Sequence, residues 1–230
     1  ISTKQITKVN LMINIIQSIL NGYSDFFIFL SSLLGSFGLA TIMLSFLAAL
    51  LMTIPMSWAE KIAVEDSKIQ AIISPQIHKI KKDKTGFDQH SSIQRLYSRY
   101  SYNPIFIFRS LMPLFIQLPL LIFTYFMFSR LQVIQGESFL WIKDLSSPDG
   151  ILYGKGNILP FLMTFISLIA AFFMPNFTYK NLLQAVSVSL LFFILLYNER
   201  SILLLFWTIN NIIMFVRNII STLKNGNINR

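Results

Sequence analysis

The chain has 230 residues, of which 54% are hydrophobic and 13% are charged, and its mean hydropathy is +0.60. Because soluble domains carry about 25% charged residues, this composition excludes a soluble globular protein and indicates an integral membrane protein. The net charge of +9 predicts membrane topology and contact with anionic lipid rather than direct contact with nucleic acid. The absence of cysteine excludes disulfides, thiolate catalysis and cysteine-ligated metal.

Four or five apolar runs approach the length of about 20 residues that a helix needs to cross a bilayer. Backbone groups in lipid must be hydrogen-bonded internally, so these runs predict a helical bundle. We therefore expect an all-α polytopic membrane protein. Its parts would be a five-helix transmembrane bundle, a cytoplasmic helical hairpin and an N-terminal interfacial helix.

The N-terminal segment, residues 1–35, mixes polar and apolar residues. Within Leu11–Leu34, polar residues such as Asn14 and Gln17 interrupt a run of Ile, Leu and Phe. A helix of this composition is typical of the membrane interface. We expect an amphipathic interfacial helix, and a tilted span is the alternative.

The membrane core is expected over residues 36–220, with a cytoplasmic tail over 221–230. Its first span should run from Phe37 to Met56 and end at Pro55. The only long polar segment, Ser57–Pro104, comes next.

The apolar residues of Ser57–Pro104 recur at helical spacing in two arms. The first arm contains Ile62, Ile69, Ile73, Ile77 and Ile80, and the second contains Ile93, Leu96, Tyr97 and Tyr100. Gly86 and its polar neighbours mark a turn, so the two stripes predict a helical hairpin whose arms pack face to face. Pro75 should bend the first arm, because its ring removes a backbone donor and clashes one turn back.

Four further spans follow the hairpin, separated by polar connections. They are expected at Ile105–Phe128, Ile158–Met174, Leu182–Tyr197 and Ile202–Ile220. Pro113 and Pro119 interrupt the first of these spans. In the polar loop of residues 130–157, the apolar run Phe139–Ile142 can lie at headgroup level, with Trp141 as an interface anchor. We expect Trp207 to be a second anchor.

The orientation follows from the distribution of Lys and Arg. With the hairpin in the cytoplasm, thirteen of the 19 Lys and Arg residues lie on that side and six on the other. Cytoplasmic loops carry the excess of positive charge. The count therefore predicts an outer N-terminus and a cytoplasmic C-terminus.

An enzyme would need convergent titratable groups, and the spans contain almost none. We therefore expect neither an enzyme nor a cofactor or metal. The spans do contain uncharged polar residues, which are costly in lipid unless they face one another or water. Gln117 lies between Pro113 and Pro119, so it either joins two helices or lines a cavity. Asn210 and Asn211 have the same two interpretations. Arg109 either extends to the lipid headgroups or faces such a cavity.

Several motifs in this order resemble those of the YidC/Oxa/Alb membrane protein insertases. They are KIQAIISPQIHKIK in the hairpin, NPIFIFRSLMPLFIQLP, FLWIKDLSSPDG, ILPFLMTFISLIA and LLLFWTINNI. The resemblance covers roughly Gly38 to Ile220. Most bacterial members place an arginine in the first core span, where this chain has Ala49 or Leu50, and this departure suggests a short, divergent bacterial branch.

The resemblance implies five core helices around a hydrophilic groove that is open to the cytoplasm and to lipid. The groove would admit polar client segments and release apolar helices sideways into lipid, without nucleotide or metal. The expected groove residues are Gln117, Arg109, Thr124, Thr208, Asn210 and Asn211. The hairpin residues expected to serve it are Ile69, Ile73, Pro75, Ile77 and Leu96.

The expected location is the bacterial inner membrane, and the expected partners are nascent membrane proteins, membrane lipids and a ribosome or translocon. Two other functions stay open. One is a small transporter or flippase subunit for a lipid-linked substrate, against which the absence of internal repeats counts. The other is a noncatalytic scaffold of a membrane complex.

Overall fold

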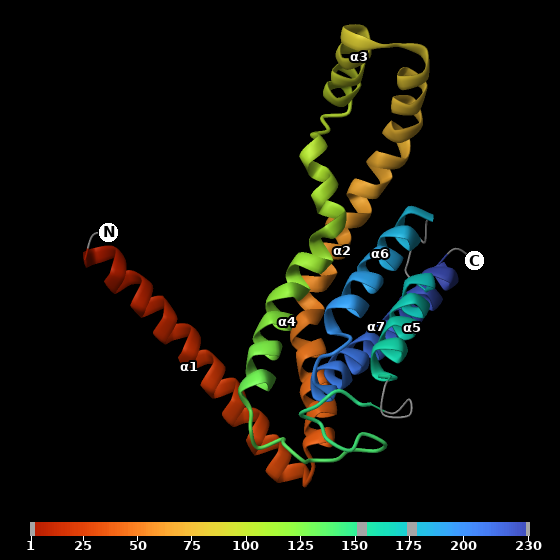
Figure 1. Ribbon diagram of the computed structural model, residues 1–230. Helices are drawn as coiled ribbons and strands as arrows, with labels where there is room; N and C mark the ends of the chain where they lie inside the picture. The colour runs from red at the N-terminus through yellow and green to blue at the C-terminus, as the bar shows by residue number, and fades with distance from the viewer. Residues whose placement is uncertain (1–2, 151–155, 174–178, 229–230) are drawn as a thin grey trace. The chain divides into compact units, whose positions relative to one another are not determined.

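The computed structural model describes residues 3–150, 156–173 and 179–228, and this described part is helical apart from its connecting loops. The helices form two compact units. The core unit comprises Ile1–Leu51 and Ile122–Arg230, and the hairpin unit comprises Met52–Leu121. The all-α fold predicted from composition is confirmed (Figure 1).

The helix α2, Phe37–Asp83, contributes to both units. It runs for 47 residues and continues through Pro55 and Pro75. The helix therefore does not end at Pro55, because a long helix tolerates the loss of one backbone donor where its other bonds persist. The end of the membrane span near Pro55 stays a prediction. The bend expected at Pro75 stays a prediction.

The hairpin unit pairs the C-terminal part of α2 with α3, Gly86–Arg99, and the two arms run antiparallel (Figure 1). Ile73 and Leu96 are buried together with Tyr102, and Ile69 and Ile77 pack against them. The turn between the arms contains Gly86 at φ +61°, a backbone conformation that glycine adopts without strain. The predicted hairpin with face-to-face apolar stripes is confirmed.

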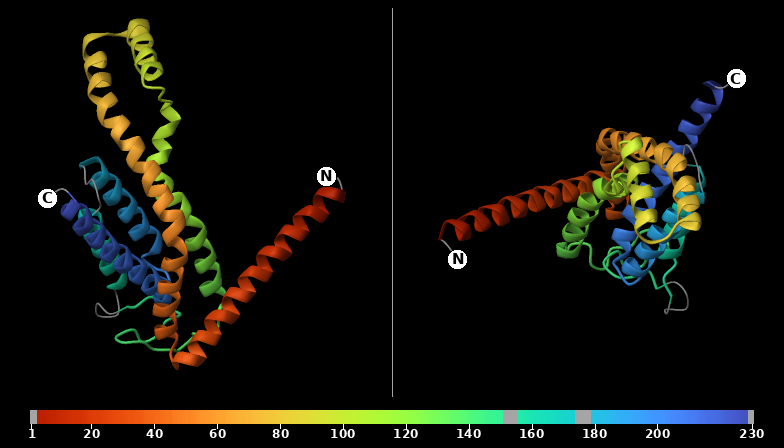
Figure 2. Two further views of the ribbon diagram at one scale, coloured as in Figure 1. Left: turned by 180° about the vertical axis from the view of Figure 1, so that it is seen from behind. Right: turned by 90° about the horizontal axis from the view of Figure 1, so that it is seen from above.

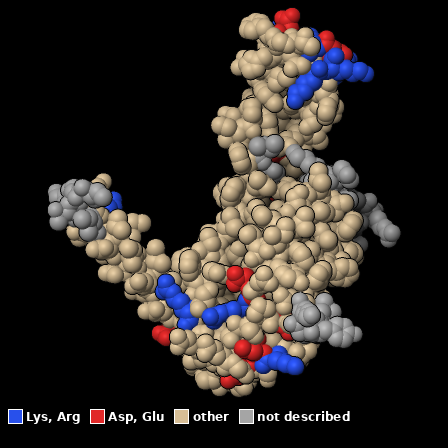
Figure 3. Space-filling model, in the orientation of Figure 1, with Lys and Arg blue, Asp and Glu red and all other residues tan. Residues whose placement is uncertain are grey.

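The tip of the hairpin is charged. On the face shown in Figure 3, Lys, Arg, Asp and Glu gather at this tip. The exposed residues there include Lys81, Lys82 and Lys84 beside Asp83 and Asp88. Burial of these charges would be costly, so this end of the unit is built for solvent.

The α3 helix ends in a Schellman motif that places a non-glycine residue in the left-handed region. The backbone N–H of Tyr102 donates to the carbonyl of Tyr97 at 2.9 Å, and that of Ser101 to Ser98 at 3.1 Å. Ser101 has φ +48°. A side chain in this conformation costs about 1 kcal/mol.

We expect Ser101→Gly to raise the free energy of unfolding of the hairpin by about 1 kcal/mol, because glycine relieves this strain. The measurement is hydrogen exchange of the α3 amides in detergent micelles. Ser98→Gly, inside the same helix, is the control and should lower stability by about 0.5–1 kcal/mol. Destabilisation by both variants would contradict a strained Ser101.

The second span does not begin as an α-helix at Ile105, as predicted. Residues Pro104–Leu111 form the 3₁₀ helix η1, and the α-helix α4 begins only at Met112 and ends at Arg130. The reason is Pro113, whose ring would clash with the carbonyl of Arg109 in an α-helix. That carbonyl instead accepts from the N–H of Met112, as in a 3₁₀ turn.

The core unit contains three neighbouring helices after α4: α5, Leu159–Phe172; α6, Tyr179–Leu196; and α7, Ser201–Ile228. Both α6 and α7 lie beside α5 (Figures 1 and 2). The first eight residues of α7, 201–208, are all buried. The core of this unit is therefore centred on the N-terminal half of α7.

Small and hydroxyl residues of α2 allow close packing with α7. Ala40, Thr41, Ser45 and Ala48 are all buried. The hydroxyl of Ser45 donates to the carbonyl of Thr41 at 2.8 Å and lies 3.2 Å from the carbonyl of Phe206 on α7. Such small residues let helices approach closely in lipid.

Three described helices are long and apolar enough to cross a membrane by length and composition. They are Phe37–Asp83, Met112–Arg130 and Ser201–Ile220. The expected third and fourth spans correspond to the shorter apolar stretches Leu159–Phe172 and Leu182–Leu196. The expected end of the third span, Met174, lies outside the described part.

The N-terminal helix α1 spans Thr3–Leu34, and its buried residues lie in its C-terminal half. Leu20, Phe27 and Leu30 are buried, whereas the described side chains before Leu20 are exposed. The ring of Phe27 meets that of Phe128 edge-on, with the centroids 5.2 Å apart. Figure 2 shows the remainder of α1 extending away from the other helices of the core unit.

Candidate functional site

Gln117 is a polar residue in the part of α4 that belongs to the hairpin unit. Its side chain is half-buried. Within the described part of the chain, its amide forms no hydrogen bond with another residue. A glutamine that joined two helices would be hydrogen-bonded across them, so this geometry favours an amide that is available to another molecule.

Arg109 lies in η1, eight residues before Gln117, and its side chain is exposed. Its guanidinium carbon lies 3.5 Å from the centroid of the Phe106 ring. This cation–π contact holds the charge beside the helix without neutralising it. Arg109 can therefore attract an anionic group.

The other expected groove residues belong to the core unit, and three of them bond along or between its helices. Thr208 donates to the carbonyl of Leu204 at 2.7 Å, and Asn210 donates to that of Phe206 at 2.9 Å, both within α7. The amide of Asn211 donates to the hydroxyl of Ser167 on α5 at 2.7 Å. Of the two interpretations of Asn211, the structure favours helix packing.

Thr124, the fourth of these residues, is fully buried. Its hydroxyl lies 3.3 Å from the phenol of Tyr23 on α1. A pair of hydroxyls satisfies both groups away from water. The contact therefore ties α1 to α4 inside the core unit.

Two further hydrogen bonds join α5 and α7 nearer the C-terminal end of α7. Asn218 donates to the carbonyl of Ala170 at 2.9 Å, and Thr222 donates to that of Phe173 at 3.2 Å. Asn211, Asn218 and Thr222 follow helical spacing, so they lie on one face of α7. Hydrogen bonds of this kind join helices where lipid offers no hydrophobic drive for association.

Trp207 is buried inside the core unit. Only 5% of it is exposed, and its ring centroid is 5.3 Å from that of Phe192 on α6. The tryptophan fills the core between two helices, which corrects the expected anchoring role. Trp141, in contrast, is 48% exposed.

Trp141 lies at the tip of a tight turn in the loop that follows α4. Phe139 and Ile142 exchange two backbone hydrogen bonds of 2.9 Å, and Leu140 between them has φ +52°. Leu140 and Trp141 are exposed, whereas Ile142 is buried. Of the four residues expected at headgroup level, two point outward.

Side chains that no local sequence pattern predicted hold this loop in place. Asp149 is buried, and its Oδ2 accepts from the N–H groups of Ile158 and Leu159 at 2.7 and 3.0 Å. Arg200 donates from Nη1 to the carbonyls of Phe128 and Leu131 at 2.8 and 3.3 Å. Asp149 therefore caps the start of α5, and Arg200 caps the end of α4.

Asp144 organises the same loop. Burial acts to raise its pKa, but hydrogen bonds from the Ser146 hydroxyl and from the N–H groups of Ser146 and Gly136 outweigh this and hold the pKa below its ordinary value. Asp144 therefore stabilises the folded loop above the pKa of the unfolded chain. This contribution is lost as the pH falls through the lower folded pKa.

A buried polar cluster, which the sequence pattern did not predict, lies at the base of the hairpin. Asp66 is 2% exposed, its Oδ2 accepts from the amide of Gln70, and both contact the phenol of Tyr102. Burial, followed by the charge of Asp66, raises the pKa of Tyr102. The i, i+4 spacing of Asp66 and Gln70 was the available signal.

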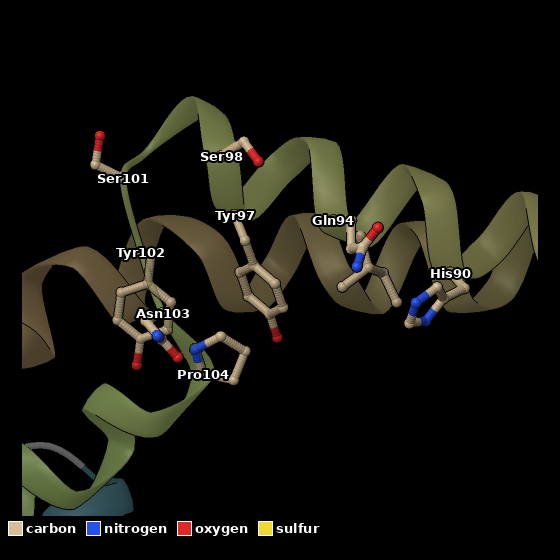
Figure 4. Close-up of a pocket in the computed structure, with 9 residues that line it drawn as sticks. His90, Gln94, Tyr97, Ser98, Ser101, Tyr102, Asn103 and Pro104 are labelled. Atoms are coloured by element: carbon tan, nitrogen blue, oxygen red, sulfur yellow. The ribbon is translucent and has the colours of Figure 1, made fainter.

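A shallow pocket of about 780 Å³ lies along α3 and the segment that follows it. Figure 4 shows Gln94, Tyr97, Tyr102 and Asn103 directed to this side. The side-chain oxygen of Asn103 accepts from the N–H of Ile105 and caps η1. The pocket is polar and aromatic, and its lining carries no cysteine or carboxylate.

Comparison with known proteins identifies relatives over most of the chain. A family model described as 60Kd inner membrane protein matches residues 29–227. The membrane protein insertase YidC of Clostridium tetani is 44% identical over 82 residues, which cover 35% of this chain and 36% of that protein. The insertase YidC of Clostridium perfringens is 28% identical over 158 residues and 63% of each chain.

One further relative and one solved structure are also similar to this chain. The insertase YidC of Treponema denticola is 31% identical over 194 residues, 76% of this chain and 33% of that protein. A structure described as active YidC insertase with its first transmembrane domain resolved has a TM-score of 0.57 at 24% identity. It covers 87% of this chain and 45% of that chain, and it shows a shared fold.

This chain thus spans between about one third and two thirds of the length of these curated relatives. The family model, however, extends from α1 to the end of α7, and it includes both the hairpin and the core unit. The resemblance noted in the sequence is confirmed. The chain belongs to the 60Kd inner membrane protein family, which includes the YidC membrane protein insertases.

Proposed function

We propose that this protein is a membrane protein insertase of the bacterial inner membrane. The observation that carries the proposal is the unpaired amide of Gln117 in the apolar N-terminal half of α4, which the family match includes. A polar group in lipid needs a partner, and a polar client segment would supply one. The proposed partners are nascent membrane proteins and lipids, with a ribosome or translocon delivering the client.

In the proposed mechanism, a polar client flank meets Gln117 and Arg109 while its apolar segment passes sideways into lipid. Each polar group that crosses the bilayer without a partner costs several kcal/mol. Even one hydrogen bond along the path lowers that cost. The energy comes from burial of the apolar client segment, so the mechanism needs no nucleotide or metal.

We place the charged tip of the hairpin and the end of α7 on the cytoplasmic side. The excess of Lys and Arg supports this orientation. The hydrogen-bonded loop around Asp144, Asp149 and Arg200 would then close the outer side. A closed outer side fits a protein that inserts segments without leaking ions.

The test is reconstitution of the full chain into liposomes with a ribosome-synthesised client that has one span and a short polar flank. Protease protection of the flank measures insertion. We expect protection to rise several-fold over protein-free liposomes. Transfer of a fluorescent lipid between leaflets, without client protection, would support a flippase, and neither activity would support a scaffold.

Arg109→Glu should impair insertion of clients whose translocated flank is acidic and spare clients with a neutral flank. A partly desolvated arginine attracts a carboxylate more strongly than it does in open water, and reversal of its charge would repel that flank. We expect about a tenfold loss for acidic flanks in the liposome assay, equal to about 1.4 kcal/mol.

The control is Arg99→Glu, which reverses an exposed charge at the end of α3. It should affect both client sets equally and weakly. If Arg109→Glu also affects both sets equally, or neither, Arg109 anchors the chain to headgroups and has no client role.

A further inference from the structure

The exposed Arg109 lies at the end of a row of aromatic contacts inside the hairpin unit. Its guanidinium carbon lies 3.5 Å from the centroid of the Phe106 ring, and Phe106 precedes it by three residues in η1. Side chains three residues apart eclipse one another in a 3₁₀ helix, whereas in an α-helix they are offset by about 60°. The 3₁₀ conformation of η1 therefore places the guanidinium over this ring.

The ring of Phe106 is held by Tyr102. The two rings meet edge-on at 88°, with their centroids 5.8 Å apart. This geometry is favourable, because the positive edge of one ring faces the negative face of the other. The N–H of Phe106 also donates to the carbonyl of Asn103 at 2.8 Å. Contacts from a side chain and from the backbone therefore restrict the ring on which Arg109 lies.

Tyr102 is in turn anchored to the first arm of the hairpin. It is buried, and its phenol contacts the side chains of Asp66 and Gln70 on α2. Oδ2 of Asp66 accepts from the amide of Gln70, whereas Oδ1 is buried without a hydrogen-bond partner in the described part of the chain. An unpartnered buried oxygen opposes folding, and such a group calls for an explanation beyond packing.

We propose that Tyr102 and Phe106 are positioning residues that hold the guanidinium of Arg109 ready to bind a carboxylate of a client flank. Asp66 keeps Tyr102 in place. A guanidinium stacked on a ring keeps the N–H groups at its edge free, and two parallel N–H groups match the two oxygens of a carboxylate. The stack also restricts the side chain before the client arrives, which lowers the entropy lost on binding. This inference rests on the proposed insertase function and names the residues that prepare Arg109 for its ligand.

The first test measures insertion of clients with acidic and with neutral flanks in the liposome assay. Phe106→Leu removes the ring below the guanidinium, and Tyr102→Phe removes the phenol hydroxyl but keeps the ring. We expect insertion of acidic flanks to fall about threefold and about twofold, respectively, which is the size of an exposed cation–π contact. Neutral flanks should be unaffected. Phe106→Tyr retains an aromatic face and should retain the preference for acidic flanks.

Tyr100→Phe is the matched control, because the Tyr100 hydroxyl also joins the two arms. It accepts from the side-chain amide of Gln76 on α2 at 3.2 Å. Loss of this hydroxyl should leave both client sets unchanged. If Phe106→Leu and Tyr102→Phe reduce acidic and neutral flanks alike, or reduce neither, the proposal is overturned.

A second measurement needs no insertion activity. In NMR spectra of the arginine side chains of the full chain in detergent micelles, the ring current of Phe106 should shift the Arg109 Hε signal upfield of that of the exposed Arg99. Phe106→Leu should abolish the shift, Tyr102→Phe should reduce it, and Tyr100→Phe should leave it unchanged. An Arg109 signal without the shift, or one that Phe106→Leu does not change, would contradict the stack.

The same spectra test the ligand class. A short peptide with the sequence of the acidic flank should move the Arg109 signal, and a peptide with Gln and Asn in place of Glu and Asp should not. Equal responses to the two peptides, or no response to either, would overturn a carboxylate site. A response to the acidic peptide alone in a chain that inserts no client would support the carboxylate site and refute the insertase function.

Discussion

Gly38→Ala is expected to destabilise the core unit by about 1–3 kcal/mol, and Gly38→Leu by more. A Cβ atom at this position would overlap the ring of Phe139. Two backbone hydrogen bonds to Ile142 hold the main chain of Phe139 in place, so the overlap is relieved only if the ring leaves its rotamer. Overpacking of a close helix–loop contact carries this cost. The measurement is the free energy of unfolding in detergent micelles.

Gly22→Ala in α1 is the matched control, since nothing lies within 4 Å of a Cβ atom there. It should stabilise the helix by about 0.5–1 kcal/mol. Phe139→Ala should rescue part of the Gly38→Ala defect, because it removes the overlapping ring. Similar effects of Gly38→Ala and Gly22→Ala would show that the loop does not pack on α2 at this point.

Asp149→Asn is expected to lower the free energy of unfolding of the core unit by about 3 kcal/mol. The carboxylate accepts from two backbone N–H groups at the start of α5, and each charge-assisted bond contributes about 1.5–3 kcal/mol. The amide retains the shape but loses the charge, which the N-terminal end of the helix dipole favours. Thermal and denaturant unfolding of the purified chain measure the loss.

Asp88→Asn provides the comparison, because Asp88 is an exposed acidic residue in the first turn of α3. It should cost no more than about 0.3–1 kcal/mol. A loss for Asp149→Asn as small as that for Asp88→Asn would mean that water, rather than Asp149, satisfies the start of α5.

The parts of this fold that the sequence predicted depend on local periodicity. The apolar stripes at Ile69, Ile73 and Ile77 predicted the hairpin, because side chains at helical spacing must share a face. Helix boundaries were less accessible. Pro55 was compatible with a helix end or with a continuous helix. Pro113 delays the start of the α-helix to Met112, seven residues after the expected start at Ile105.

The site was harder to predict, because a polar residue in a span has the same sequence signature whether it joins helices or faces a groove. Asn211 proved to bond to Ser167, and Trp207 to pack on Phe192. Asp149 acts on backbone groups nine and ten residues later. A local sequence pattern does not predict such a distant partner, because the conformation of the intervening loop determines whether Asp149 contacts these backbone groups.

The most direct test of the insertase proposal is photocrosslinking from position 117 in membranes, with a ribosome-bound nascent membrane protein present. Phe115 is the control position, because it is 47% exposed on the same helix but about 200° away around the axis. We predict an adduct with the nascent chain from position 117 and at least several-fold less from position 115. An adduct from position 117 with a lipid-linked glycan or one fixed subunit, or equal adducts from both positions, would contradict the proposal.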